Sequence, residues 1–265
     1  MNYIQTRTDG HFYFITINRP GKRNAFTLEM IRDFAAAVQA ADETSGARAI
    51  IVSAEGSVFS AGIDVLGLMQ ARAEAGEQNP GRWLRRWVED LQYHLNRIES
   101  VELPVIGALN GQVIGFGLEL ALAFDLRIAS NNCQLSIPET RLGLVADLGG
   151  ATRLSRVIGP ARAKDMLMTA RSVGAEEALQ WGLLNRVVAE EALLDSAIAL
   201  AQQIAQNAPL AVGMAKRIID QGDGLDKHTQ MALERWAQSL LITTEDVTEA
   251  MTAFMQKRPP EFKGR

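Results

Sequence analysis

Hydrophobic positions in the first two thirds of the chain form short apolar runs that alternate with amphipathic stretches. The apolar runs have the length of buried strands, and the amphipathic stretches repeat their apolar residues at helical spacing. Thr27 stands immediately before one of these stretches and is a typical helix N-cap residue. Alternating strands and helices indicate an α/β fold. The predicted elements, strands and helices together, are His11–Asn18, Leu28–Ala41, Ala49–Ser53, Arg82–Ser100 and Val105–Leu109.

The last third of the chain has a helical pattern throughout. Runs rich in alanine, leucine and methionine follow one another with few strand signals between them, and helical regions of this kind often form oligomers. We therefore expect a core in residues 1–200 and a helical oligomerisation region in residues 201–265. Earlier in the chain, the polar segment from Gln70 to Gly81 is expected to be mobile. The predicted helical runs cover residues 151–169, 174–181, 190–206, 209–221, 225–241 and 244–257.

The stretch from Pro104 to Asp147 carries the most chemical information. Its apolar run ends at the turn signal Asn110-Gly111, and further glycines at positions 115 and 117 precede a helix-forming run from Leu118 to Phe124. A helix that starts after glycines leaves free backbone N–H groups, where the helix dipole favours negative charge. Glu119 lies about one turn along this helix, so its carboxylate can face the same anion site.

A second loop of small residues, Ser60 to Asp64, follows an earlier predicted strand. Both loops offer exposed N–H groups, and two converging N–H donors are what an enolate or a tetrahedral oxyanion requires. Either loop alone is better explained by glycines that only make a turn. Their combination with the acids Glu119, Glu139 and Asp147 favours an anion-stabilising site with carboxylates that transfer protons.

Composition and charge narrow the classes of function. The net charge of −4 and the pI near 5.5 argue against a dedicated nucleic-acid binder. Cys133 is the only cysteine, which excludes an intramolecular disulfide and a cysteine-based zinc site. The histidines, His11, His94 and His228, lack metal-ligand spacing, so acid–base chemistry falls to carboxylates. No signal-peptide core and no apolar run of about 20 residues is present, so we expect a cytoplasmic protein without a membrane span.

A series of short motifs connects these observations. In chain order they are Asn18-Arg19-Pro20, Asn24-Ala25, Phe59–Asp64, Asn110-Gly111, Gly115–Ala121, Asp125, Pro138-Glu139, Gly143, Gly149-Gly150, Arg153-Leu154, Ala175, Ala178, Gly182-Leu183 and Val187. In this order and spacing they resemble the crotonase (enoyl-CoA hydratase/isomerase) superfamily over nearly the whole chain. The resemblance implies a crotonase (ClpP-like) fold: an α/β core of repeated ββα units with a helical C-terminal region that forms a homotrimer, or a hexamer built as a dimer of trimers.

The resemblance also implies roles for particular residues. Backbone N–H groups of Ile63 and Phe116 would form the oxyanion hole for the thioester carbonyl of an acyl-CoA. Many relatives have glycine at the second position, and phenylalanine there adds a ring near the acyl pocket. Glu119 and Glu139 match the two glutamates of enoyl-CoA hydratases, and the sequence leaves open which is the acid and which the base. Candidate substrate and CoA contacts are Lys22, Arg23, Ala25, Ala61, Gly62, Asp64, Val65, Leu66, Gly115 and Lys257.

Asp147 departs from the hydratase pattern. Hydratases of the standard type generally have a small residue at this position, whereas an aspartate resembles the Δ3,5-Δ2,4-dienoyl-CoA isomerases. The first acid of those isomerases is an aspartate, and this chain has the longer Glu119 there. A purely structural alternative is that Asp147 caps the helix that begins near Gly149.

The sequence therefore favours one function and leaves two alternatives. The leading hypothesis is an enoyl-CoA hydratase that adds water reversibly, in syn fashion, to a trans-2-enoyl-CoA. The first alternative is a Δ3,5-Δ2,4-dienoyl-CoA or Δ3-Δ2-enoyl-CoA isomerase that uses Asp147. The second, from another class, is a non-catalytic scaffold of this fold that binds acyl-CoA or RNA. We expect no metal and no separate cofactor, because coenzyme A is part of the substrate, and we expect no nucleic-acid partner.

Overall fold

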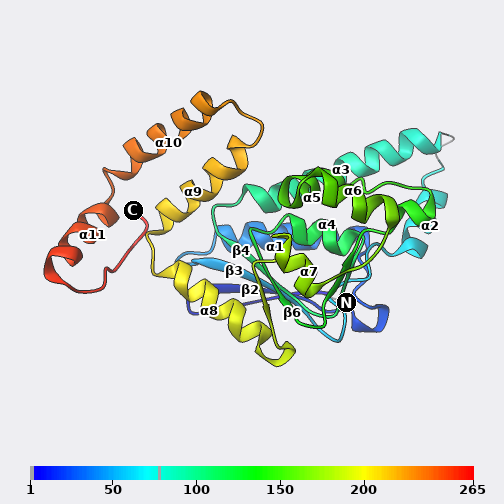
Figure 1. Ribbon diagram of the computed structural model, residues 1–265, viewed down its shortest axis with the longest axis horizontal. Coiled ribbons are helices and arrows are strands. Elements are labelled where there is room, and N and C mark those ends of the chain that lie inside the picture. The colour runs from blue at the N-terminus through cyan, green and yellow to red at the C-terminus, as the bar shows by residue number, and fades with distance from the viewer. Residues whose placement is uncertain (1–2, 77–78) are drawn as a thin grey trace.

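A six-stranded sheet forms the centre of the computed structural model, which describes residues 3–76 and 79–265 (Figure 1). Its strand order is β1-β2-β3-β4-β6-β9. β1 and β2 pair antiparallel, and all the other pairs in this sheet are parallel. The strands are β1 (Ile4–Asp9), β2 (Phe12–Ile17), β3 (Ala49–Ala54), β4 (Val105–Leu109), β6 (Leu126–Ser130) and β9 (Arg186–Val188).

A second, smaller sheet lies beside the first and creates the repeated unit. It consists of β5 (Gln112–Ile114), β7 (Gln134–Ser136) and β8 (Val173–Gly174), in the order β5-β7-β8. The chain passes from β4 to β5 and into helix α4 (Phe116–Leu122), and later from β6 to β7 and on to helix α5 (Gly150–Ile158). Each passage is a ββα unit with one strand in each sheet. The predicted α/β core of repeated ββα units is confirmed.

Helices cover both faces of the large sheet. On one face lie α1 (Leu28–Asp42), whose N-cap Thr27 accepts a hydrogen bond from the Met30 N–H as predicted, and α3 (Pro80–Ser100). On the other face lies α8 (Leu193–Ala205). Side chains alternate between these two cores along each strand, because successive residues of a strand point to opposite faces. In β3, Ile50 and Val52 belong to the larger core, whereas Ile51 packs in the core beneath α8.

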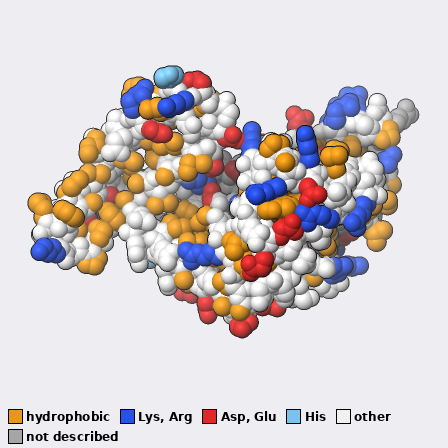
Figure 2. Space-filling model, viewed as in Figure 1, with side chains coloured by type: hydrophobic (Ala, Val, Ile, Leu, Met, Phe, Trp, Pro, Cys, Tyr) orange, Lys and Arg blue, Asp and Glu red, His pale blue; other side chains and the backbone are white. Residues whose placement is uncertain are grey.

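The C-terminal helices extend away from this core as an arm (Figure 1). The arm comprises α9 (Pro209–Gly222), α10 (Lys227–Leu241) and α11 (Glu245–Gln256), close to three of the predicted helical runs. Figure 2 shows hydrophobic side chains over the arm and a hollow between the arm and the rest of the molecule. This hollow is a cleft of about 1180 Å³ between α9 and the elements α3, β6 and α5. The division at residue 200 stays a prediction, and α8 runs through that position.

Several element boundaries differ from the prediction. The expected run 151–169 is two helices, α5 and α6 (Pro160–Thr169), because Gly159 has a φ of +80° and a proline follows it. The helix expected from Leu118 begins earlier, at Phe116. The expected mobile segment Gln70–Gly81 is helical in its first part, since α2 spans Val65–Glu74, and residues 77–78 lie outside the described residues. The remaining regular elements are α7 (Ala175–Gln180) and short 3₁₀ turns at Pro20–Lys22, Glu139–Leu142 and Glu190–Ala192.

Across residues 3–76 and 79–265, no helix combines the length and the apolar character that crossing a bilayer requires.

Candidate active site

The two predicted donor loops are joined by backbone hydrogen bonds. Ser60 and Val113 form a parallel bridge, in which the Ser60 N–H donates to the Gln112 carbonyl (3.1 Å) and the Ile114 N–H donates to the Ser60 carbonyl (2.9 Å). Ile63 follows Ser60 by three residues, and Phe116 follows Val113 by three. Because parallel strands run in the same direction, this register carries the two expected donors to the same end of the bridge.

A glycine allows the two loops to approach each other closely. Gly62 has a φ of +98°, and a Cβ atom at this position would lie 3.1 Å from the Ile114 carbonyl oxygen and 3.6 Å from the Phe116 nitrogen. Any other residue would therefore be strained in its backbone and crowded against the second loop. The consequence is that the Ile63 and Phe116 N–H groups lie on neighbouring stretches of backbone.

Both of these N–H groups are available to a ligand. The Phe26 N–H donates to the Gly62 carbonyl and the Asp64 N–H donates to the Phe26 carbonyl, both at 2.8 Å, so the Ile63 N–H points away from Phe26. Phe116 is the first residue of α4, where an N–H has no acceptor within the helix. Among the described residues neither group donates to a protein atom.

The side chain of Phe116 does not stand in open space. Its ring is 2% exposed and packs edge-on against Phe26, with ring centroids 5.1 Å apart. The ring expected near the acyl pocket is therefore part of the hydrophobic core.

Glu119 lies in α4, one turn from this donor pair, and is 2% exposed. Its Oε1 accepts hydrogen bonds from the Leu148 N–H (3.0 Å) and the Gly150 N–H (2.9 Å). Gly150 is the first residue of α5, so the carboxylate occupies the N-terminus of that helix. Burial raises the pKa of Glu119 to about 7. The negative charges of Glu139 and Asp147 also raise this pKa, whereas the two N–H bonds lower it.

Glu139 begins the 3₁₀ turn after β7 and reaches back over the second donor loop. Gly115 makes room for it, because a Cβ at that position would lie 2.5 Å from Glu139 Oε1. Glu139 Oε2 is buried and has no hydrogen-bond partner among the described residues. Burial, and then the negative charge of Asp147, raise the pKa of this carboxyl. A buried carboxylate oxygen without a donor is costly, so this group is suited to carry a proton or to bond a ligand.

Asp147 is half-buried beside the other two acids, and its burial raises its pKa. It does not cap α5: the N-cap is Gly149, with a φ of +97° and no side-chain cap. The structural alternative, in which Asp147 caps this helix, is therefore wrong, because the carboxylate of Glu119, from another helix, takes the position at the α5 N-terminus. The structure brings three acids with raised pKa values to one place.

Comparison with known proteins identifies the family of the chain. The sequence pattern of the enoyl-CoA hydratase/isomerase family matches residues 8–265. The chain belongs to this family, which is part of the crotonase superfamily. Its members include lyases and isomerases, so the expectation of an enzyme is confirmed.

Individual relatives cover the whole chain. The short-chain-enoyl-CoA hydratase of Clostridium acetobutylicum is 35% identical over 267 residues, which span 100% of this chain and 99% of that protein. The carnitinyl-CoA dehydratase of Escherichia coli (strain K12) is 36% identical, over 97% of each chain. Among solved structures, the enoyl-CoA hydratase from Bacillus anthracis superimposes with a TM-score of 0.91 at 34% identity and covers 100% of both chains.

In this family member the candidate CoA contacts lie around the first donor loop. The Ala61 N–H donates to the Arg23 carbonyl (2.9 Å), and the Arg23 guanidinium bonds the side chain of Gln112. Lys22 is exposed beside it, and Ala25 is half-buried. Val65 and Leu66, in the first turn of α2, are 48% and 75% exposed.

Two further candidates have different surroundings. Asp64 is held within the protein: it pairs with Arg19 at 2.8 Å and caps α2 through the Gly67 N–H, and the Arg19 hydrogen bond lowers its pKa. Lys257 ends α11, at the opposite end of the molecule from α2 (Figure 1). Within a single chain, Lys257 therefore lies far from the other candidate CoA contacts.

Some contacts of the site were not predicted. Buried Asn24 holds the chain ahead of the first donor loop: its Nδ2 donates to the carbonyls of Glu55 (2.9 Å) and Val58 (2.7 Å). Leu148 and Gly150 supply the N–H groups that bind Glu119. The motifs Asn24-Ala25 and Gly149-Gly150 were the sequence signals for these roles, but a motif does not name its tertiary partner. Within the described ranges, no group of three or more His, Cys, Asp or Glu could hold a metal ion.

Proposed function

We propose that the chain is an enoyl-CoA hydratase, which adds water reversibly to the double bond of a trans-2-enoyl-CoA. The observation that carries this proposal is the pair of buried carboxyls, Glu119 and Glu139, with raised pKa values beside two unpaired backbone N–H groups. Acyl-CoA chemistry of this kind needs one group that takes a proton from water and another that gives one to carbon. The named relatives, a hydratase and a dehydratase, support the same class of reaction.

The N–H groups of Ile63 and Phe116 would bind the thioester oxygen. When the water oxygen bonds C3 of the substrate, the electron pair of the C2–C3 double bond moves toward the thioester, and its oxygen gains negative charge. Two donors that are already oriented stabilise this enolate without reorganisation, and one such donor is typically worth about 3 kcal/mol. Protonation of C2 then completes the addition.

The contacts of the two glutamates favour different roles. Oε1 of Glu119 accepts two backbone N–H bonds, which favour its ionised form, so we assign Glu119 as the base that takes the proton from water. Oε2 of Glu139 has no donor among the described residues, which favours its protonated form, so we assign Glu139 as the acid that protonates C2. The two carboxyls repel each other when both are ionised, so one proton shared by the pair is the expected resting state.

The surroundings of the carboxyls suit an apolar acyl chain on a CoA thioester. Large apolar side chains next to the first donor loop and beside the acids are exposed, where a bound chain would cover them. We propose Lys22 and Arg23 as partners of the CoA phosphates, and no cofactor other than the coenzyme A of the substrate. The exposed apolar residues are Val65, Leu66, Leu142, Leu144 and Val145.

We also propose that the protein is a homotrimer or a dimer of trimers. Trp236, Phe254 and Met255 on the arm are 71%, 83% and 75% exposed, an unusual exposure for large apolar side chains that a neighbouring copy would cover. In such an assembly Lys257 would meet the CoA of another copy, since it lies far from the candidate site of its own chain.

Glu139→Gln tests the hydratase proposal. The variant should hydrate crotonyl-CoA and decenoyl-CoA at least about 10²-fold more slowly, the scale of a lost general acid–base group. Exchange of the C2 protons of butyryl-CoA with D₂O separates the roles: it should be lost in Glu139→Gln and kept in Glu119→Gln. Near-normal hydration by Glu139→Gln would contradict the function, and the reverse exchange pattern would contradict only the assignment of acid and base.

Asp147 supports a second candidate, double-bond isomerisation. Its carboxyl adds a third acid with a raised pKa, and it has no capping role that would account for it. A panel of 2-enoyl, 3-enoyl and 3,5-dienoyl-CoAs should be tested with the wild type and Asp147→Asn. If the wild type converts only the dienoyl substrate and Asp147→Asn abolishes that conversion, isomerisation replaces hydration as the function.

A further inference from the structure

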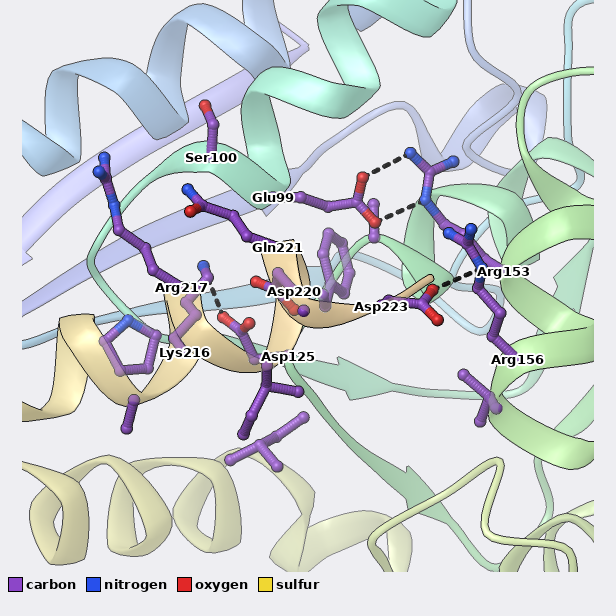
Figure 3. A pocket seen from close by; sticks show the side chains of 18 of the residues that line it. Glu99, Ser100, Asp125, Arg153, Arg156, Lys216, Arg217, Asp220, Gln221 and Asp223 are labelled. Carbon is purple, nitrogen blue, oxygen red and sulfur yellow. Dashed lines mark hydrogen bonds and ion pairs between the residues drawn. The ribbon is translucent and has the colours of Figure 1, made fainter. Parts of the chain in front are cut away.

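All three guanidinium nitrogens of Arg153, on α5, donate hydrogen bonds to other residues. Its Nε and one terminal nitrogen donate to the two carboxylate oxygens of Glu99 on α3, both at 2.7 Å, as the dashed lines in Figure 3 show. The same terminal nitrogen reaches Asn96 Oδ1 (2.9 Å), and the other donates to the Leu148 carbonyl (2.9 Å). The Arg153 side chain is 11% exposed and that of Glu99 is 36% exposed, so the arginine is the more buried partner of this charge-assisted pair.

Leu148 connects this guanidinium to the candidate active site. Its carbonyl oxygen accepts from Arg153, and its own N–H donates to Glu119 Oε1. The next residue, Gly149, is shaped around the same cation: its φ is +97°, and a Cβ atom there would overlap the Arg153 guanidinium. The turn that ends in the Gly150 N–H, the second donor to Glu119, is therefore held between Arg153 on one side and Glu119 on the other.

We infer that Arg153 is a positioning residue for the reaction: by holding the Leu148 carbonyl, it keeps the Leu148 and Gly150 N–H groups aimed at the carboxylate of Glu119. This inference rests on the proposed function, in which Glu119 takes a proton from water. An N–H bond to a carboxylate favours its ionised form. If the turn from Leu148 to Gly150 moved away, Glu119 would lose these bonds, would be protonated more often and would be poorly oriented. Glu139 and Asp147 also face Glu119, and their negative charges raise its pKa, as the loss of these bonds would.

A neighbouring arginine on the same helix provides a matched control. Arg156 lies one turn further along α5 and pairs with Asp223, the residue that follows α9 (2.6 Å), in the same cleft (Figure 3). Its side chain is 57% exposed, and it makes no contact with the turn from Asp147 to Gly150 among the described hydrogen bonds and ion pairs. Removal of Arg156 therefore removes a charge and an ion pair from α5 without releasing Leu148.

The test compares Arg153→Gln, Arg153→Lys and Arg156→Gln. We expect Arg153→Gln to lower kcat for crotonyl-CoA by about 10- to 100-fold, the scale of one hydrogen bond to a charged group, with little change in KM. The acidic limb of its pH–rate profile should move to higher pH, by about one unit. Arg153→Lys, which keeps a donor for the Leu148 carbonyl, should recover part of the rate, and Arg156→Gln should behave as the wild type.

A measurement that needs no turnover separates this inference from the proposed function. The infrared band of the protonated Glu119 carboxyl, identified by its absence in Glu119→Gln, can be followed in a pH titration of each variant. If the wild type hydrates no enoyl-CoA but Arg153→Gln still shifts this titration upward, the proposed function fails and the positioning role holds.

Unchanged kcat, pH profile and Glu119 titration in folded Arg153→Gln would overturn the inference. If Arg153→Gln does not fold, Glu99→Gln and Arg153→Lys provide the test instead. Glu99→Gln weakens the bonds that hold the Arg153 guanidinium, and Arg153→Lys weakens the bond to the Leu148 carbonyl, while both keep a hydrogen-bonding group in place. A shift in neither variant would then be the contradicting result.

Discussion

The ionisation of Glu119 should cost the folded protein stability, and a single substitution can measure that cost. Burial raises the pKa of this carboxyl to about 7 from an ordinary value of 4.5. The folded state therefore holds the Glu119 proton up to a higher pH than the unfolded chain does. Its contribution to stability is fully present below pH ~4.5 and is lost as the pH rises through about 7.

The magnitude follows from the two pKa values. At about 1.36 kcal/mol per pH unit, the interval from 4.5 to about 7 corresponds to about 3 kcal/mol of unfolding free energy. Glu119→Gln removes the titration while the amide oxygen can still accept the Leu148 and Gly150 N–H groups. The free energy of unfolding of the variant should therefore exceed that of the wild type by about 3 kcal/mol more at pH 8 than at pH 4. Glu139 contributes part of this difference, because its carboxyl ionises more easily in the variant, where residue 119 is neutral.

Urea denaturation of both proteins across pH 4–8.5, at one fixed protein concentration, measures this difference. Subtracting the two curves cancels the titration of all the groups that the substitution leaves unchanged. Glu234→Gln, at an exposed position on α10, gives the baseline for the same chemical change at the surface. If the difference between wild type and Glu119→Gln changes by less than about 1 kcal/mol over this range, the carboxyl of Glu119 is not destabilised by its burial, and the reasoning is refuted.

Two other substitutions test particular contacts. Gly115→Ala should lower hydration at least about tenfold without unfolding the protein, because the added Cβ would lie 2.5 Å from Glu139 Oε1 and because a φ of +54° strains alanine in the donor loop; full activity with normal circular dichroism would contradict the packing. Phe254→Ser combined with Met255→Ser should shift the protein toward the monomer in analytical ultracentrifugation, because both side chains are largely exposed on the arm. An unchanged oligomer, or a wild type that is itself monomeric, would exclude this surface as the interface.

Local sequence signals predicted those parts of the fold that depend on neighbouring residues. Thr27 precedes an amphipathic run and caps α1, and the turn at Asn110-Gly111 ends β4 as expected. By contrast, β1 was not predicted, because only Ile4 of this strand is buried and its other side chains face solvent. The break between α5 and α6 is missing from the prediction although Gly159-Pro160 is a breaker signal, because the helix-forming runs on either side of this pair were joined into one.

The candidate site was predictable in its residues but not in its contacts. The acids and both donor loops came from motifs, and the geometry then brought them together. The bonds from Leu148 and Gly150 to Glu119 join positions about 30 residues apart, and no local pattern encodes such a pairing. The same contact excludes the structural alternative for Asp147: its spacing before Gly149 suits an N-cap, but a carboxylate from another helix occupies that place.

The bridge between Ser60 and Val113 has a consequence for how this enzyme can diversify. The two proposed oxyanion donors are main-chain atoms whose separation is set by paired backbone, so the side chains attached to them are not needed for the interaction. The Phe116 ring is accordingly free to serve the core, where it packs against Phe26. Substitutions at positions 63 and 116 can therefore alter packing and pocket shape while the pair of N–H groups is retained. Chemistry carried by the backbone is inherited with the fold, and it leaves the side chains open to selection for new substrates.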